Sequence, residues 1–458
     1  MTLIKSISGI RGTIGGRPGE GLTPPDIVRY TSAWGIWLMK QEKKSSYSAV
    51  IGRDARISGE MVKHLVCGTL MGMGINVIDA GSATTPTVEM AVKFENADGG
   101  IILTASHNPV QWNALKLLNN KGEFLSAEDG EHLLEIAAEG SFNYAGVYEL
   151  GKYRTETGYT RRHIEEILKL PLVDTSAIRE RNFRIAVDAV NSVGGTAVPE
   201  LMEALGVKDV IRLYCDPDGK FPHNPEPLPE NLRDLSDTVV SEKADLGFAL
   251  DPDVDRLAIV NEDGGMFGEE YTLVAVADYI LQYTKGNTVS NLSSTSALRD
   301  ITEKHGGTYS ASAVGEVNVV AEMKRTGAVI GGEGNGGVIY PQLHYGRDAL
   351  AGIALFLSHL ARSGMKCSEL RNKYPYYYLS KNRADLPDDA DTEAILSKIK
   401  DIYSDHPIND TDGVRIDFEE GWVHLRKSNT EPIIRIYSEA TTREQAEILA
   451  GRITGHII

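Results

Sequence analysis

Apolar positions along the chain form two patterns, short continuous runs and longer stretches with helical spacing. Continuous runs at Ala49–Ile51, Ile75–Ile78 and Ile101–Leu103 are typical of strands buried in a parallel sheet. In Met61–Met73 the apolar residues recur three and four positions apart, which predicts an amphipathic helix. The repeated order of strand and helix predicts an α/β fold with mixed or parallel sheets and helices on both faces.

The same alternation continues to about residue 370 and then changes. After that point three predicted strands are separated only by short connections, which indicates an antiparallel sheet with helices on one side. We therefore expect three consecutive α/β domains followed by a C-terminal antiparallel α+β domain. Their expected ranges are 1–150, 151–256, 257–370 and 371–458.

A polar hexapeptide, Thr104–Pro109, follows the apolar run Ile101–Leu103 directly. Its Asn-Pro step forces a turn, so Ser106 is expected just past the C-terminal end of a buried strand. Open α/β sheets place reactive groups at this position. His107 is the next residue. Lys116 follows in an extended segment, where it points away from the face that buries its leucine neighbours. The sequence thus brings a hydroxyl, an imidazole and an ammonium close together.

Three interpretations of this loop remain open on the residues alone. It can be an ordinary polar turn. A Ser/His hydrolase dyad is disfavoured, because adjacent side chains seldom act as nucleophile and base and no Gly-x-Ser-x-Gly is present. The third interpretation is that Ser106 carries a phosphoryl group and Lys116 donates or accepts the proton.

A second polar loop contains three carboxylates with strict spacing. Asp251, Asp253 and Asp255 follow the apolar run Leu246–Leu250, and Arg256 comes next. Carboxylates at alternate positions share one side of an extended segment and repel one another unless a cation lies between them. Oxygen ligands favour Mg²⁺, and the spacing of a calcium helix-loop-helix is absent. The alternative is an acidic surface turn.

Bulk properties exclude several function classes. The chain has 458 residues and a formal net charge of −17, which argues against nucleic acids and anionic membranes as partners. Three scattered cysteines, Cys67, Cys215 and Cys367, fit neither a disulfide framework nor a zinc site. We expect a reduced, cytoplasmic setting, since the sequence shows no signal-peptide core and no apolar run of membrane-spanning length.

Three further polar segments can each be a binding loop or an ordinary turn. Glycines beside Arg11 suggest an anion nest. Glu333 and Asn335 lie in a glycine-rich loop and offer hydrogen-bonding groups for a ligand. Arg426–Pro432 combines an arginine with hydroxyls and an amide, which suits a phosphate group.

Taken in order, these five segments resemble the motifs of the α-D-phosphohexomutases. TASHNP with a lysine ten residues after the serine is specific to that family, and the resemblance extends over all four expected domains. Three positions depart from the family pattern. Pro252 replaces a usual glycine, Asn335 a serine and Gly337 a histidine.

The resemblance implies a mutase that moves phosphate between the 1- and 6-positions of a hexose within one central cleft. Phosphorylated Ser106 is then the carrier, and Arg256 contacts its phosphoryl group. Lys116, Arg11 and His107 are expected to assist proton transfer, while Glu333 and Asn335 bind the sugar. The resemblance also implies a Mg²⁺ ion on Ser106, Asp251, Asp253 and Asp255. It implies a site for the non-reacting phosphate on Arg426, Ser428, Asn429 and Thr430.

The family resemblance leaves the substrate open. A hexose 1,6-bisphosphate is the expected intermediate and activator. Glucosamine phosphate is the favoured substrate, and a phosphomannomutase/phosphoglucomutase of broad hexose specificity is the alternative. A sugar-phosphate phosphohydrolase or a non-catalytic binding protein is a remote third option. We expect a monomer or homodimer with no nucleic-acid or membrane partner.

Overall fold

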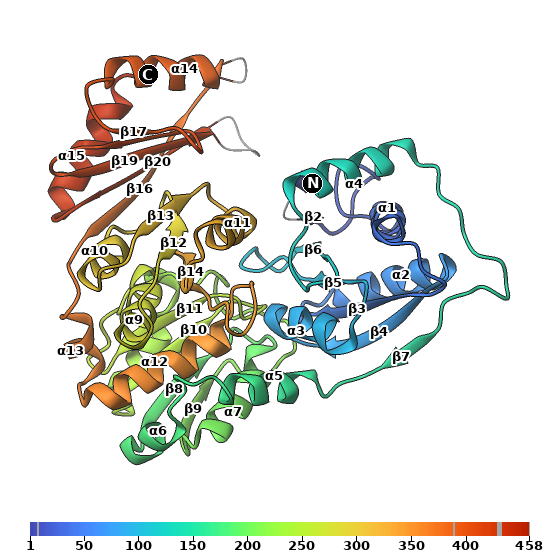
Figure 1. Ribbon diagram of the computed structural model, residues 1–458, viewed down its shortest axis with the longest axis horizontal. Coiled ribbons are helices and arrows are strands. Elements are labelled where there is room, and N and C mark those ends of the chain that lie inside the picture. The colour runs from blue at the N-terminus through green and yellow to red at the C-terminus, as the bar shows by residue number, and fades with distance from the viewer. Residues whose placement is uncertain (7–8, 388–389, 428–432, 458) are drawn as a thin grey trace. The chain divides into compact units, whose positions relative to one another are not determined.

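The computed structural model describes residues 1–6, 9–387, 390–427 and 433–457 (Figure 1). The chain divides into two compact units. The first unit comprises Met1–Thr272 with Asn335–Leu370, and the second comprises Leu273–Gly334 with Arg371–Ile458. Among the described residues, no helix combines the length and the apolar character needed to span a membrane.

The first unit opens with a seven-stranded mixed sheet in the order β1-β2-β6-β5-β3-β4-β7. Strands β3, β4, β5 and β7 run parallel, while β5, β6, β2 and β1 pair antiparallel in turn. The strands are β1 Leu3–Ser6, β2 Gly9–Thr13, β3 Tyr47–Arg53, β4 Ile75–Ser82, β5 Gly99–Leu103, β6 Trp112–Leu118 and β7 Tyr153–Thr155.

Helices cover both faces of this sheet, as expected. Alternate strand residues face opposite ways, so Ile101 and Leu103 pack with α1, α2 and α4, whereas Ile102 packs with α3 on the other face. The helices are α1 Pro24–Gln41, α2 Gly59–Gly72, α3 Thr85–Glu95 and α4 Ala127–Glu139. Arg11, for which the sequence suggested an anion nest, lies within β2, whose backbone is paired with β1 and β6.

A four-stranded sheet, β11-β10-β8-β9, follows in the same unit. Its strands are β8 Arg184–Asp188, β9 Asp209–Leu213, β10 Leu246–Leu250 and β11 Leu257–Asn261. Its helices are α5 Tyr159–Leu168, α6 Thr175–Arg181, α7 Gly194–Leu205 and α8 Arg233–Ser241, with the 3₁₀ turn η1 at Pro229–Asn231. Strand β11 pairs antiparallel with β10, so this sheet continues beyond the domain boundary expected at residue 256.

The remaining elements of the first unit include two helices, α9 and α13, that cross from one unit to the other. These remaining elements comprise α9 Glu269–Tyr283, β15 Gly337–Ile339, α12 Ala349–Ser363 and α13 Cys367–Arg371. The residue before α12, Asp348, caps the helix by accepting hydrogen bonds from the backbone N–H groups of Leu350 (2.9 Å) and Ala351 (3.1 Å).

The second unit contains a parallel arrangement and an antiparallel sheet. Strand β12 pairs parallel with both β13 and β14. These elements are β12 Thr288–Asn291, α10 Ala297–Lys304, β13 Tyr309–Ser312, α11 Glu316–Thr326 and β14 Ile330–Glu333.

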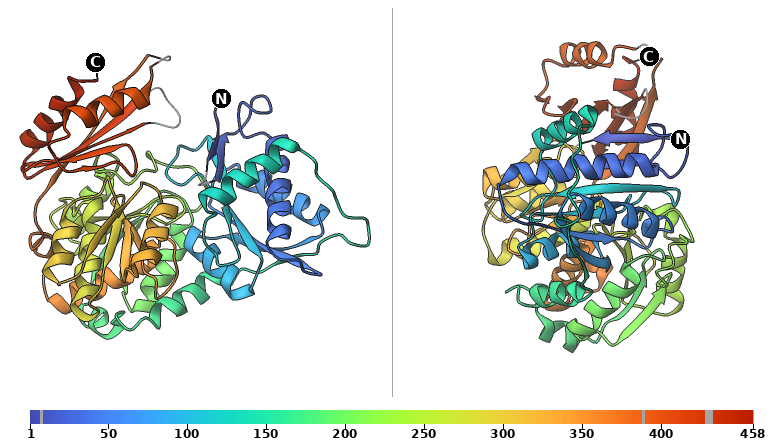
Figure 2. Two further views of the ribbon diagram at one scale, coloured as in Figure 1. Left: turned by 45° about the horizontal axis from the view of Figure 1, so that its top comes forward. Right: turned by 90° about the vertical axis from the view of Figure 1, so that its right-hand side faces the viewer.

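The antiparallel sheet follows the order β16-β20-β19-β18-β17. Its elements, red in Figures 1 and 2, are β16 Tyr378–Asp385, α14 Thr392–Ile402, β17 Ile408–Asn409, β18 Val414–Asp417, β19 Gly421–Lys427, β20 Ile433–Ala440 and α15 Arg443–Thr454. The expected antiparallel α+β fold is confirmed, with β16 as an additional edge strand. Only Ala384 in β16 is buried, so this strand has no continuous apolar run to reveal it.

Candidate active site

Two loops of the first unit meet at the candidate active site. Ser106 follows the end of β5, and Asp251 follows the end of β10. The Ser106 hydroxyl donates a hydrogen bond of 2.6 Å to Asp251 Oδ2. Because that proton is given to a carboxylate, Ser106 is not activated by His107, and the hydrolase dyad loses its geometric basis.

The backbone at Ser106 adopts φ of 49°, in the left-handed region that non-glycine residues seldom occupy. The conformation is supported by a hydrogen bond of 2.9 Å from its N–H to Thr104 Oγ1. Strained residues of this kind persist where surrounding contacts fix them, and they concentrate at functional sites.

Arg56 provides several of these contacts. Its side chain is buried, and its Nε lies 3.0 Å from Asp54 Oδ2. The same guanidinium donates to four backbone carbonyls of the serine loop and its flank. These are the carbonyls of Ser106, Asn108 (2.6 Å), Pro109 (2.8 Å) and Trp112 (3.1 Å). One planar fork therefore holds the whole turn, a geometry that a lysine ammonium cannot reproduce.

Asp251, Asp253 and Asp255, which we call the carboxylate cluster, are fully buried. Each offers an oxygen within 4.8 Å of the others. Among the described residues, Asp253 Oδ1 and Asp255 Oδ1 have no hydrogen-bond partner. Buried polar atoms are almost always satisfied, so these two oxygens fit a hard cation such as Mg²⁺.

Cationic side chains surround the carboxylate cluster. Lys116 Nζ lies 2.7 Å from Asp253 Oδ2 and 3.3 Å from Asp255 Oδ2. Arg347 Nη2 lies 2.6 Å from Asp255 Oδ2. In addition, the Thr85 hydroxyl donates a hydrogen bond of 2.6 Å to Asp253 Oδ2. Lys116 was expected near the serine from the sequence.

Arg56, Arg347 and Thr85 were not expected at this site. Nothing in their local sequence marks them, apart from the N-terminal position of Thr85 in a helix and the position of Arg347 before a helix cap. Their participation depends on which segments the fold brings together.

Burial and charge shift the pKa values in different directions across the site. Burial alone would lower the pKa of Lys116, but Asp253 and Asp255 raise it above its ordinary value. Burial raises the pKa of Asp251 well above its usual range, with further contributions from Asp255 and Asp253. In contrast, Lys116 overcomes burial and lowers the pKa of Asp253. Lys116 is therefore an ammonium at neutral pH.

The remaining candidates of the first unit lie around the same loops. Arg11 Nη1 donates to Asn108 Oδ1 at 3.3 Å. Burial lowers the pKa of His107 well below its ordinary value, with help from Arg256, Arg11 and Arg347, so its imidazole is neutral. Arg256 Nη1 lies 3.4 Å from Glu226 Oε1, and Arg256 Nε lies 3.9 Å from Asp255 Oδ1.

The candidate sugar residues belong to different units, and each is described by itself. Glu333 ends β14, where its Oε1 accepts hydrogen bonds from Asn291 Nδ2 at 2.9 Å and Gly315 N–H at 3.0 Å. Asn335 Oδ1 accepts a hydrogen bond of 3.2 Å from the N–H of Gly337, within a tight turn.

The candidate phosphate loop is described only at its start. Arg426 lies in β19, and its Nε is 2.7 Å from Asp412 Oδ2. Ser428, Asn429 and Thr430 lie outside the described residues.

Comparison with known proteins agrees with this fold. Four successive segments match the phosphoglucomutase/phosphomannomutase family. Alpha/beta/alpha domains I, II and III match residues 3–144, 161–265 and 268–377, and the family's C-terminal domain matches residues 383–456.

Individual relatives match over nearly the full length. A "Phosphoglucomutase/phosphomannomutase" of Thermococcus kodakarensis is 37% identical over 95% of each chain. A "Probable phosphoglucosamine mutase" of Methanopyrus kandleri is 34% identical over 96% of this chain and 95% of that protein. A crystal structure of a phosphoglucomutase/phosphomannomutase family protein from Burkholderia thailandensis superposes with a TM-score of 0.86. It is 26% identical and covers 100% of this chain and 98% of that one.

The fold and the matched relatives define a phosphohexomutase isomerase built from α/β domains and a C-terminal antiparallel domain. The chain belongs to the phosphoglucomutase/phosphomannomutase family, the α-D-phosphohexomutases.

Proposed function

We propose that this chain interconverts a hexose 6-phosphate and the corresponding hexose 1-phosphate through a phosphorylated Ser106. The observation that supports this proposal most directly is the hydrogen bond of 2.6 Å between Ser106 Oγ and Asp251, beside two further buried aspartates and Lys116. A serine used only in a turn has no need of such surroundings.

The transfer proceeds in two balanced halves. In the first half, the free hydroxyl oxygen of the sugar phosphate bonds to phosphorus while the bond between phosphorus and Ser106 Oγ breaks. The hydroxyl loses its proton and Ser106 Oγ gains one. The resulting hexose 1,6-bisphosphate turns over, and Ser106 Oγ then takes the other phosphoryl group. No net phosphate is gained or lost.

The chain's own charges support both halves. Lys116, as an ammonium, can give a proton to Ser106 Oγ when it leaves and recover one in the reverse step. Arg256 and Arg11 provide fixed positive charge for the phosphoryl oxygens, which reduces the cost of concentrating negative charge in the transition state. Neutral His107 can donate or accept a hydrogen bond there.

The carboxylate cluster with Ser106 Oγ would hold Mg²⁺, because its oxygens are hard ligands and two of them are otherwise unsatisfied. When bound, the ion polarises the transferring phosphoryl group and offsets its charge. Asp251, Asp253 and Asp255 are already fixed by Arg256, Lys116 and Arg347 and by backbone N–H groups. They need little reorganisation to serve as ligands.

Sugar and phosphate recognition are assigned to the remaining candidates. Glu333 and Asn335 would bind sugar hydroxyls. Arg426, together with Ser428, Asn429 and Thr430, would bind the phosphate that is not reacting. Our expected domain division at 1–150, 151–256, 257–370 and 371–458 assigns one task to each segment. In that order the tasks are to carry the phosphoserine, to bind the metal ion, to bind the sugar and to bind the non-reacting phosphate.

Glucosamine phosphate is the substrate we favour, with mannose and glucose phosphates as the alternative. The relatives bear both kinds of name, so the choice needs a direct measurement. Coupled assays with glucosamine, mannose and glucose 6-phosphates side by side provide it. A kcat/KM at least tenfold higher for glucosamine 6-phosphate supports the favoured substrate. Comparable values support the broad-range alternative. Release of inorganic phosphate without isomerisation would contradict both.

A further inference from the structure

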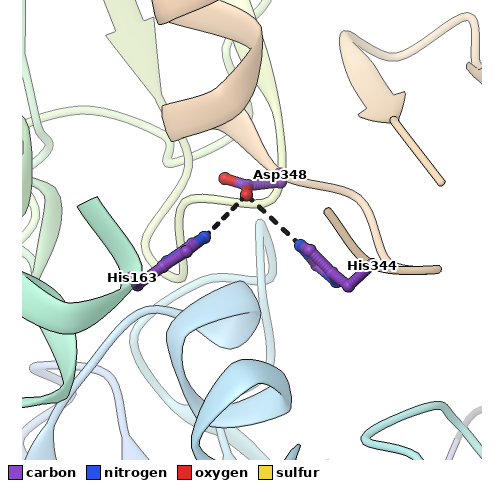
Figure 3. A group of neighbouring side chains, drawn as sticks. All are labelled: His163, His344 and Asp348. Atoms are coloured by element: carbon purple, nitrogen blue, oxygen red, sulfur yellow. Dashed lines mark hydrogen bonds and ion pairs between the residues drawn. The ribbon is translucent and has the colours of Figure 1, made fainter. Parts of the chain in front are cut away.

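A second group of potential metal ligands lies in the first unit, among residues that the proposed phosphoryl transfer does not use. His163 comes from α5, His344 from the loop after β15, and Asp348 from the residue before α12. All three side chains are buried. Both imidazoles direct Nε2 at one oxygen, Asp348 Oδ2, at 2.9 Å from His163 and 3.2 Å from His344 (Figure 3). We call these three residues the imidazole cluster.

Each ring also has a polar neighbour at its outer nitrogen, which hydrogen-bonds to the ring in the case of His163. His344 Nδ1 lies 3.1 Å from Glu89 Oε2, and His163 Nδ1 lies 3.1 Å from Thr87 Oγ1. Histidines that bind metals have this arrangement, in which a carboxylate or hydroxyl on one nitrogen fixes the ring and leaves the other nitrogen for the ion. The loop approaches Glu89 so closely that a Cβ at Gly346 would lie 1.8 Å from its Oε2.

The ligand atoms of the imidazole cluster are close enough to share one ion. Each of the three residues offers a ligand atom within 4.8 Å of the other two. Nitrogen and oxygen ligands about 2.0–2.1 Å from a tetrahedral ion lie about 3.3 Å apart. The three atoms can therefore reach one ion with only small side-chain movements.

We propose that His163, His344 and Asp348 bind one divalent transition-metal ion such as Zn²⁺, separate from the ion at the carboxylate cluster. Two imidazole nitrogens select this class of ion over Mg²⁺, which prefers oxygen ligands. The Glu89 carboxylate and the Thr87 hydroxyl orient the two rings from outside.

The ion has a structural role in this arrangement. Helix α3 carries Glu89 and Thr87, and its first residue, Thr85, donates to Asp253. The residue before Asp348 is Arg347, which contacts Asp255. An ion at the imidazole cluster thus joins α3, α5 and the start of α12. Two of these segments place side chains on the carboxylate cluster.

Cobalt titration of the chelator-stripped wild-type protein tests the proposal. Millimolar Mg²⁺ is kept present so that the carboxylate cluster is saturated. We expect one equivalent of Co²⁺ to bind, with the visible absorption of cobalt in a four- or five-coordinate site, and one equivalent of Zn²⁺ to displace it. The protein should also melt at a higher temperature with Zn²⁺ than with Mg²⁺ alone.

Three variants locate the site. His163→Gln and His344→Gln should each lose the cobalt spectrum and the Zn²⁺-dependent shift in melting temperature. Asp253→Asn is the matched control, because it alters the carboxylate cluster and should keep both signals. Retention of the full cobalt spectrum in either histidine variant would overturn the assignment.

The cobalt titration of the wild-type protein tests the proposed metal site even if a variant does not fold. Absence of any bound cobalt in the presence of Mg²⁺ would overturn the proposal. The proposal would also be overturned if the ¹⁵N spectrum of the His344 ring shows both nitrogens protonated and unchanged by Zn²⁺. In that case His344 Nε2 has no lone pair to give to a metal ion.

Discussion

The carboxylate cluster and the imidazole cluster are both buried groups of potential metal ligands, yet they are built in opposite ways. The three carboxylates of the carboxylate cluster come from five consecutive residues, and they are contacted by the cationic side chains of Lys116 and Arg347. The second joins side chains that are up to 185 residues apart, and its neighbours at the outer ring nitrogens are a carboxylate and a hydroxyl.

We infer that this difference separates a site for the reaction from a site for structural support. The carboxylate cluster touches a serine hydroxyl, and its pairing with Lys116 and Arg347 leaves oxygens available for a hard ion. Within the described residues, the side-chain hydrogen bonds and ion pairs of the imidazole cluster reach no residue that we assign to phosphoryl transfer. A site for chemistry needs an open ligand position, while a structural ion can be enclosed by the protein. Four substitutions test this division, beginning with the largest expected effect.

Ser106→Ala should reduce turnover by roughly 10⁴-fold or more, the scale seen when a nucleophile is removed. The intact wild-type protein should include a form heavier by one phosphoryl group on the peptide with Ser106, and the variant should lack it. Mass spectrometry and a coupled assay provide both readouts. Ser404→Ala, at an exposed serine, is the control. Cobalt binding at the imidazole cluster should not change, and a fully active Ser106→Ala protein would end the proposed mechanism.

Asp253→Asn should lower activity by roughly 10²- to 10³-fold, because several kcal/mol of charge stabilisation depend on the ion at this cluster. Excess Mg²⁺ should recover part of the loss. Chelation should abolish wild-type activity, and Mg²⁺ should restore it. The control, Asp209→Asn, removes an exposed partner of Arg184 and should behave as wild type. Activity indifferent to chelation would show that the three aspartates bind no functional ion.

Arg56→Lys tests whether the serine loop must be held in place. Lysine keeps the charge beside Asp54 but cannot reach four carbonyls at once. We expect kcat to fall by about 10²-fold, as a displacement of about 1 Å in a reacting group can produce, with little change in KM. Stopped-flow measurement of phosphoryl loss from Ser106 isolates this step. Arg325→Lys, in a surface ion pair with Glu322, is the control. An unchanged kcat would mean that the loop holds its conformation without the guanidinium.

Arg426→Ala should have the smallest effect of the four substitutions, and it should weaken substrate binding rather than the chemical step. One charge-assisted contact to phosphate contributes about 1.5–3 kcal/mol, so sugar-phosphate binding should weaken roughly 10- to 100-fold. Bisphosphate should escape more often and accumulate in solution during turnover. Phosphorylation of Ser106 and both metal responses should be retained. Arg443→Ala, at an exposed arginine paired with Glu447, is the control. A wild-type KM with no released bisphosphate would show that Arg426 serves only its ion pair with Asp412.

The sequence by itself determined the elements of the fold and those candidate site residues that are close together in the chain. Apolar runs and helical spacing predicted most strands and helices, because burial on one or both faces produces those periods. The strict spacing of Asp251, Asp253 and Asp255 and the position of Ser106 after a strand were visible for the same local reason. Edge strand β16 was missed, since an exposed edge has little apolar pattern to show.

Only the tertiary structure decided which distant side chains meet. Arg56 reaches the serine loop across about fifty residues of sequence, and Arg347 reaches Asp255 across 92. Neither has a local pattern, because a single buried charge is positioned by the packing of whole segments. His163, His344 and Asp348 are the clearest case. In the sequence each of them is an ordinary polar residue. They form a group of potential metal ligands only because the fold brings α5 against the start of α12.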